Sequence, residues 1–257
     1  MRAPLRGFGL VELMVAMLLG LTLVLALLQY LGGSRDAWLL QQLSARQQED
    51  ARYLLGRLAR DIRAAGSYGC LDLQRLLPQG LPADLAQPVR FDQGVLTLIT
   101  GLPVQVAVEE PQPMRAADFG ARWLLAGDCQ QRVGLADEHA LSVMPGDWLL
   151  PLRLVEYRQQ DDRVQVRLNG NGNFETLIEG VTRFEPRFAL AADASAAGVS
   201  GRYQPGLDEA EQERLRSVRI ALELSDRSAD TGRERMRTLV FRQVTQVRNR
   251  PDWGSDE

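Results

Sequence analysis

Near the N-terminus, the residue most able to do chemistry is Glu12, a single carboxylate inside an apolar segment. It is the only charged residue between Gly7 and Ser34. A carboxylate at the centre of a membrane-spanning helix costs about 2.5–3.5 kcal/mol on insertion scales. A free α-amine at Phe8, one helical turn earlier, would be its best partner, and that amine exists only if the chain is cut after Gly7. The spacing predicts a cut between Gly7 and Phe8 and a charge pair on Glu12.

Other side chains with catalytic or ligating chemistry are few. The 30 basic residues are all Arg, which excludes a Schiff-base lysine and a P-loop lysine. His139 is the single histidine, which excludes a His-rich metal site and argues against a His-dependent triad. Two cysteines, Cys70 and Cys129, exclude zinc-finger and iron–sulfur spacing but permit one disulfide. We therefore expect a protein that is not an enzyme and that holds no cofactor and no metal.

Length and composition indicate a folded protein with an appendage. The chain has 257 residues, 45% hydrophobic and 25% charged, with a formal charge of −3. It is therefore long and apolar enough to bury a core, as one domain with an appendage or as two small domains. The near balance of charge gives no global attraction to nucleic acid or anionic lipid.

The segment from Phe8 to Leu31 is long enough to cross a hydrocarbon core of about 30 Å. Arg2 and Arg6 precede it, which favours a cytoplasmic N-terminus and an outward C-terminal bulk. A secretory signal peptide would have a shorter apolar region followed by a small-residue cleavage site, and no such site follows here. An ordinary membrane anchor is the second alternative, but plain anchors rarely keep a carboxylate such as Glu12.

The stretch Arg6-Gly7-Phe8-Gly9-Leu10-Val11-Glu12, followed by an apolar run, resembles the class III signal of type IV pilins. The resemblance implies cleavage after Gly7 by a prepilin peptidase, N-methylation of Phe8, and pairing of Glu12 with the amine of a neighbouring subunit. Gly9 stands where Ser or Thr is common. Gln29 stands where major pilins often carry proline in the first helix, which points to a minor subunit.

A second helical pattern follows the apolar segment. Apolar residues recur mostly at three- and four-residue spacing, with Gln, Arg, Glu and Asp (Asp61 among them) between them, which predicts an amphipathic helix that buries one stripe against its own domain. Gly66 is the expected C-cap, and Gly20, Gly32 and Gly33 are expected points of bending or local melting. A coiled-coil dimer is the alternative, but sustained heptads are missing. The stripe comprises Leu40, Leu43, Ala51, Leu54, Leu58, Ile62 and Ala65.

The rest of the chain reads as short strands, so the expected fold class is α+β, a long helix packed on an antiparallel sheet as in pilins. The expected elements are strands over 91–100, 104–108, 218–224 and 239–247, a hairpin joining 148–159 to 163–169, and a short helix over 208–216. The expected organisation is a leader over 1–7, a membrane or bundle half-helix over 8–33, an amphipathic half over 34–66 and a periplasmic globular domain over 67–257.

Local features resemble PilW-type minor pilins: Ala64 to Cys70 at the end of the helix, Leu177 to Phe184 before a strand, and the run from Val247 to Arg250. In an oxidising periplasm, Cys70 and Cys129 would form a disulfide closing a loop of about 60 residues, worth at most about 4 kcal/mol. Two free buried thiols are the main alternative.

Several motifs are better read as ordinary loops or surfaces. Asp230-Thr231-Gly232 is a single copy of an aspartic-protease triplet, although such a site needs two carboxylates. The run from Asn169 to Asn173 lacks the carboxylates of a calcium loop, and Asn-Gly favours a turn. His139 is read as a solvated loop residue, and the segment 193–201 as a mobile loop. Three alternating arginines, which could touch phosphates, are read as a solvated face: Arg233, Arg235 and Arg237.

These features together predict a minor pilin that helps to initiate a type IV pilus, in a priming or tip complex. The expected location is the inner membrane, with a periplasmic domain, and then the pilus. The expected partners are other minor pilins, the major pilin, the prepilin peptidase, the assembly platform and a tip adhesin. A type II secretion pseudopilin, a DNA-binding pilin of an uptake machine and an anchored enzyme are the alternatives.

Overall fold

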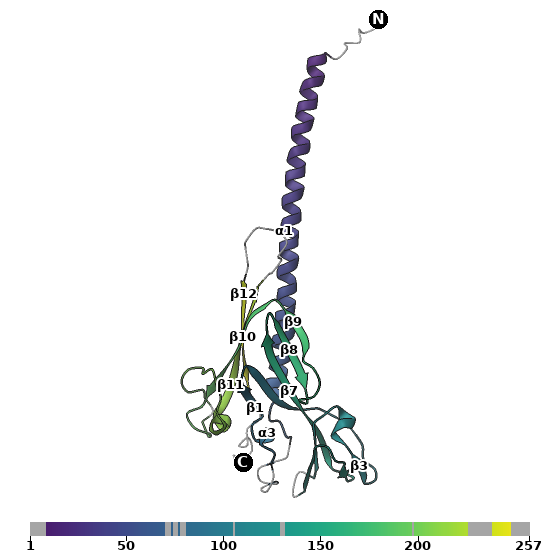
Figure 1. Ribbon diagram of the computed structural model, residues 1–257, viewed down its shortest axis with the longest axis vertical. Coiled ribbons are helices and arrows are strands. Elements are labelled where there is room, and N and C mark those ends of the chain that lie inside the picture. The colour runs from purple at the N-terminus through teal and green to yellow at the C-terminus, as the bar shows by residue number, and fades with distance from the viewer. Residues whose placement is uncertain are drawn as a thin grey trace. The chain divides into compact units, whose positions relative to one another are not determined.

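The computed structural model describes residues 9–69, 73, 77, 81–104, 106–128, 132–196, 198–225 and 238–247 (Figure 1). The chain divides into two compact units, residues 1–49 and Asp50–Glu257, which we describe separately. Helices and antiparallel sheets are both present, so the α+β class is confirmed.

Helix α1 runs from Leu10 to Ala64 without interruption. It passes through Gly20, Gly32 and Gly33, so the expected local melting at these glycines is wrong. The cost of about 1 kcal/mol for each Gly is spread over a long helix whose other residues, mostly Leu around Gly20 and before Gly32, have good helix propensity. The helix ends before Gly66, whose φ of +70° suits glycine, so the predicted C-terminal boundary is confirmed.

The larger sheet has seven strands. Five follow the order β1-β2-β7-β4-β5, while β8 pairs with β7 and β9 pairs with β8. The predicted hairpin from Trp148 is confirmed, because β7 and β8 pair over residues 155–160 and 163–168. The strands are β1 (Val89–Asp92), β2 (Val95–Gly101), β4 (Trp123–Gly127), β5 (Val133–Ala136), β7 (Trp148–Gln160), β8 (Arg163–Leu168) and β9 (Glu175–Glu179).

A second sheet has the order β10-β11-β12, with the three strands side by side in Figure 1. The strands are β10 (Val181–Leu190), β11 (Leu215–Ser225) and β12 (Thr238–Gln246). Two predicted strands, 218–224 and 239–247, are thus confirmed within a residue or two, apart from an earlier start to β11. The alternation in β11 also holds, since Val218, Ile220, Leu222 and Leu224 are all at most 2% exposed.

The remaining elements are short. Strands β3 (Gln112–Met114) and β6 (Leu141–Val143) form a two-stranded sheet. Helix α3 covers Ala83–Ala86, and 3₁₀ helices η1 and η2 cover Ala116–Phe119 and Glu209–Arg214. The helix predicted over 208–216 is therefore present only as the 3₁₀ turn η2.

Two strand predictions are wrong. The segment 91–100 is not one strand, because Gln93 (φ 46°) and Gly94 (φ 80°) form a tight turn between β1 and β2. Two positive φ angles are the geometry of a type I′ hairpin, for which Asn-Gly rather than Gln-Gly is the usual signal. No strand occurs in the described part of 104–108, where Val104 and Val108 pack irregularly against the cluster around Leu124.

The main core of the second unit lies between the end of α1 and both larger sheets. Ala51, Leu54, Leu58, Ile62 and Ala65 are at most 1% exposed and share one cluster with side chains of β2, β7, β10 and β11. The predicted stripe is confirmed from Ala51 onward. It is wrong at Leu40, which is 62% exposed and lies in the first unit.

Candidate functional site

Glu12 lies in the first turn of α1, where its position follows from helix-start chemistry. Gly9 accepts the backbone bond from the Leu13 N–H at 3.3 Å, and its own N–H donates to Glu12 Oε2 at 3.0 Å. This is one half of a capping box, in which the acidic residue at the third helical position reaches back to the residue before the helix. Gly9 has no side chain to supply the other half. The carboxylate also lies at the positive end of the helix dipole.

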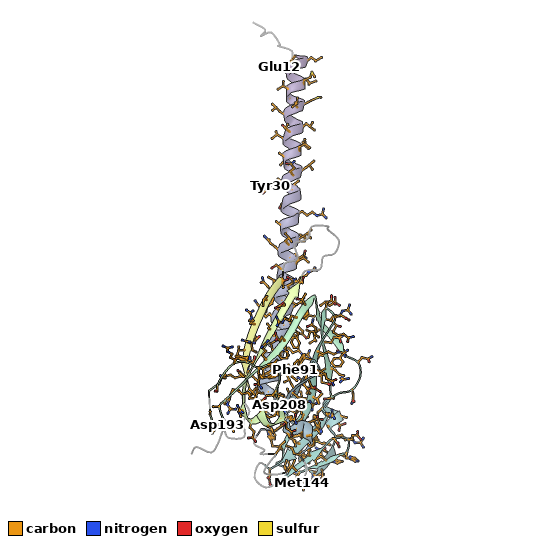
Figure 2. All side chains as sticks on the ribbon, turned by 60° about the vertical axis from the view of Figure 1, so that its left-hand side comes forward. Glu12, Tyr30, Phe91, Met144, Asp193 and Asp208 are labelled. Carbon is orange, nitrogen blue, oxygen red and sulfur yellow. The ribbon has the colours of Figure 1, made fainter. Side chains whose placement is uncertain are left out.

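The surface around Glu12 is apolar on every side. Figure 2 shows side chains projecting all around the helix between Glu12 and Tyr30. Leu10, Met17 and Leu23 are each more than 60% exposed. An 18-residue window of α1 has a mean hydropathy of 2.5 with none of it buried, so the helix is long and apolar enough to cross a membrane. Leu10 to Leu31 spans about 33 Å at 1.5 Å per residue, against a hydrocarbon core of about 30 Å.

Other predicted site residues lie outside the described residues. These are Gly7 and Phe8 at the predicted cut, Cys70 and Cys129, the triplet Asp230–Gly232, and the three arginines of 233–237. The structure therefore places Glu12 beside Gly9 but does not test the cut, the methylation or the disulfide.

The described neighbours of both cysteines meet at Trp148. Gly69 has a φ of +66°, and a Cβ there would overlap the Trp148 ring. On the other side, Gly127 is the register partner of Trp148 in the β4–β7 ladder. Asp128, the next residue, donates its N–H to the Arg132 carbonyl at 3.1 Å. Gly69 thus lies against the Trp148 ring, and Gly127 lies opposite Trp148 in the ladder, while the disulfide between Cys70 and Cys129 stays a prediction.

We expect the purified full-length protein to resist alkylation when denatured without a reductant. Reduction should expose two thiols, and Cys70→Ser should lower the free energy of unfolding by at most about 4 kcal/mol. Intact mass after iodoacetamide treatment checks the first part, with a reduced sample as control. Two alkyl groups on the unreduced chain would contradict the disulfide and favour the free-thiol alternative.

A buried polar cluster, which the sequence analysis did not predict, joins α1 to the larger sheet. Asp61 is 6% exposed and Tyr157 is fully buried, and the Tyr157 hydroxyl donates to Asp61 Oδ2 at 2.5 Å. Arg153 Nη2 lies 3.4 Å from Asp61 Oδ1. On the other side, Arg57 Nε donates to the Tyr157 oxygen at 3.1 Å. Burial, followed by the charge of Asp61, raises the pKa of Tyr157, so the phenol stays protonated.

Sequence reasoning placed Asp61 among the polar residues between the apolar positions, and the structure corrects this. Asp61 follows Leu54 by seven residues and Leu58 by three, so it falls on the buried stripe. That spacing was the available signal. Each buried side-chain polar atom of the cluster has a hydrogen-bond partner, so the cluster acts as a clamp between the helix and the sheet.

The other surveyed features behave as loops. His139 lies in the turn between β5 and β6 with its side chain 91% exposed, as predicted. Asn169 (φ 57°) begins the predicted turn, and its amide bonds the Leu154 N–H and the Gly120 carbonyl. Beside it lies an open hollow of about 730 Å³. Its Arg122 pairs with Asp84 at 3.5 Å and lies over the Trp123 ring. The described residues contain no group of three or more His, Cys, Asp or Glu that could hold a metal ion.

Compared with protein-family models, curated proteins and solved structures, the chain matches none of them. A functional assignment therefore depends on the chain's own residues and geometry.

Proposed function

We propose that this chain is a minor pilin, made as an inner-membrane prepilin, that helps to initiate assembly of a type IV pilus. The observation that carries the proposal is Glu12 in the first turn of a helix whose apolar N-terminal half is not buried. The same helix continues as an amphipathic half that packs on antiparallel sheets. A membrane anchor alone needs the apolar residues but neither the carboxylate nor this continuous helix.

The proposed mechanism is physical. The bilayer holds the apolar half-helix until assembly transfers it into a bundle of equivalent helices, where van der Waals packing replaces lipid contact. Cleavage after Gly7 frees the Phe8 amine, and Glu12 pairs with that amine on a neighbouring subunit. Because unpaired charges are costly in an apolar bundle, this pair sets the axial register between subunits. The folded outer unit then presents surfaces that select its neighbours, among them other minor pilins and the major pilin.

The apolar half-helix also accounts for the partners we propose. The prepilin peptidase must reach the segment before Phe8 on the cytoplasmic side, and the assembly platform must act on the embedded helix. Gln29 lies within the uninterrupted helix α1, which agrees with a subunit that lacks the helix-breaking proline of many major pilins.

The N-terminus of the protein purified from its native membrane tests this proposal. We expect the mature chain to begin at Phe8 and to carry one extra methyl group. Gly7→Val should leave the leader attached, because a branched side chain at the cut blocks the peptidase. Intact mass and N-terminal sequencing measure both results, with Gly7→Ala as the conservative control. A chain that begins at Met1 with its apolar segment intact would contradict the proposal and leave an ordinary anchored protein.

A further inference from the structure

Strand β12 is an edge strand without the usual protection. It has nine residues, about 30 Å at roughly 3.3 Å per residue, and pairs with β11 without a register shift. It contains neither Pro nor Gly and carries one charge, Arg242. No described strand pairs with its other edge. Long, regular, apolar edges are templates for pairing with another chain, and folded proteins normally block them.

Three other described edge strands, β10, β1 and β9, carry features that hinder pairing with another chain. In β10, Pro186 has no backbone N–H to donate. The Gln159 side chain accepts a hydrogen bond from the Phe184 N–H and donates one to the Val181 carbonyl. The Gln212 side chain donates to the Val89 carbonyl of β1. The β8–β9 pair has a register shift, and β9 begins and ends with exposed glutamates. Strand β12 has none of these features.

The backbone direction of β12 follows from one hydrogen bond. Val247 donates its N–H to the Arg216 carbonyl at 3.0 Å, continuing the register that pairs residue 246 with 217. Bonded and non-bonded pairs alternate along an antiparallel ladder. The N–H and C=O groups of Val240, Arg242 and Val244 therefore point away from β11, toward the open edge.

Side chains of the same three residues form the exposed face of the strand. Val240 is 48% exposed and Val244 is 56% exposed, with Arg242 between them. Arg183 and Glu223, on the same face of β10 and β11, pair with each other at 3.5 Å. Within the described residues, no carboxylate pairs with Arg242. The face therefore offers two apolar positions around one unneutralised cation.

The charge of Arg242 limits which strand can pair with this edge. A second copy of β12, aligned antiparallel over all nine residues, would place Arg242 opposite Arg242. Like charges directly opposite each other destabilise a strand pair, whereas opposite charges stabilise it. We propose that β12 accepts an extended strand from another pilus subunit, with a carboxylate opposite Arg242 and apolar residues two positions to either side. This rests on the proposed function only in naming another subunit as the donor.

A synthetic strand with that pattern tests the inference. The probe is the fluorescent nonapeptide Thr-Thr-Val-Thr-Glu-Thr-Val-Thr-Thr with blocked ends, and its control has Lys in place of Glu. Anisotropy titrations use the full-length protein in lipid nanodiscs. We expect the Glu peptide to bind about fivefold more tightly than the Lys peptide. Equal affinities of the two peptides, or no binding of either, would overturn the inference.

Two variants of the edge localise the binding. Val244→Pro removes an outward N–H but no bond to β11, so it should fold and weaken peptide binding at least tenfold. Val244→Thr keeps the donor and should stay within about twofold of the parent. Unfolding midpoints check that both variants fold. If Val244→Pro does not fold, Arg242→Glu provides the test, because it should reverse the preference to the Lys peptide.

Two results would contradict an open edge on β12. One is unchanged binding by a folded Val244→Pro protein, which would place the peptide elsewhere. The other is binding only after removal of residues 248–257, which would show that the chain's own C-terminal segment fills the edge. Neither result would affect cleavage at Gly7, so failure here is distinguishable from failure of the proposed function.

Discussion

A chain carrying Glu12→Ala is expected to insert into the membrane and to be cut after Gly7, but to enter the pilus poorly. Removing the carboxylate makes insertion easier by up to about 2.5–3.5 kcal/mol. It also removes the partner of the neighbouring Phe8 amine, and losing one member of a buried pair costs about 3–5 kcal/mol. Association with the bundle should therefore weaken by about a hundredfold or more. Opposite effects on insertion and assembly separate this role from that of an ordinary anchor residue.

Glu12→Gln is the matched control. Its amide oxygen still accepts the Gly9 N–H, which the parent carboxylate accepts at 3.0 Å. If Glu12 mattered only for starting the helix, Gln would restore assembly; if the charge pairs with an amine, Gln should fail as Ala does. Pilus counts by electron microscopy, with the amount of membrane-inserted protein measured in parallel, check these outcomes. Normal pili in a strain that carries only Glu12→Ala would contradict the pairing. Loss of exoprotein secretion with pili intact would favour a secretion pseudopilin.

Replacing Asp61 by alanine is expected to lower the free energy of unfolding by about 2–4 kcal/mol. The substitution removes the acceptor for the buried Tyr157 hydroxyl and the partner of Arg153, whose side chain is 28% exposed. Both contacts hold the end of α1 on the larger sheet. Tyr157 keeps its contact with Arg57, which limits the loss. Urea unfolding of the full chain in detergent, followed by tryptophan fluorescence, measures the effect.

A surface carboxylate provides the comparison for Asp61. Glu179 pairs with Arg163 at 3.3 Å, but its side chain is 67% exposed, so Glu179→Ala should cost less than about 1 kcal/mol. A cycle of Asp61→Ala, Tyr157→Phe and the double variant should give a coupling of at least about 1 kcal/mol. Equal effects of Asp61→Ala and Glu179→Ala would contradict the clamp.

Local periodicity was enough to predict the long helix, the β7–β8 hairpin and strands β11 and β12. The stripe from Ala51 to Ala65, the turn at Gly66 and the alternation in β11 each depend on residues within one helix or strand. Such patterns span only a few residues, so they can be recognised in the sequence without knowledge of tertiary contacts. The turn at Gln93 and Gly94 was not predicted, because Gln is uncommon at a positive φ and therefore gives no local turn signal.

Long-range contacts account for what local patterns did not predict. Arg216 is 3% exposed and donates to the carbonyls of Asp193, Ala194 and Ala196. A segment predicted as a mobile loop from its small polar residues is thus bonded to a buried guanidinium 20 to 23 residues away. A pattern that covers a short window of sequence cannot contain both Arg216 and the carbonyls to which it donates.

The apolar segment with its single carboxylate and the long helix can be recognised from the residues alone, because one charge in an apolar run and one periodic stripe are local features. The chain's folding decided the rest. It placed Asp61 under the sheet, brought Gly69 and Gly127 next to Trp148, and left the outer edge of β12 without a partner among the described strands. Each of these depends on which strands pair and which edges are covered, and strand pairing joins residues that are distant in the chain.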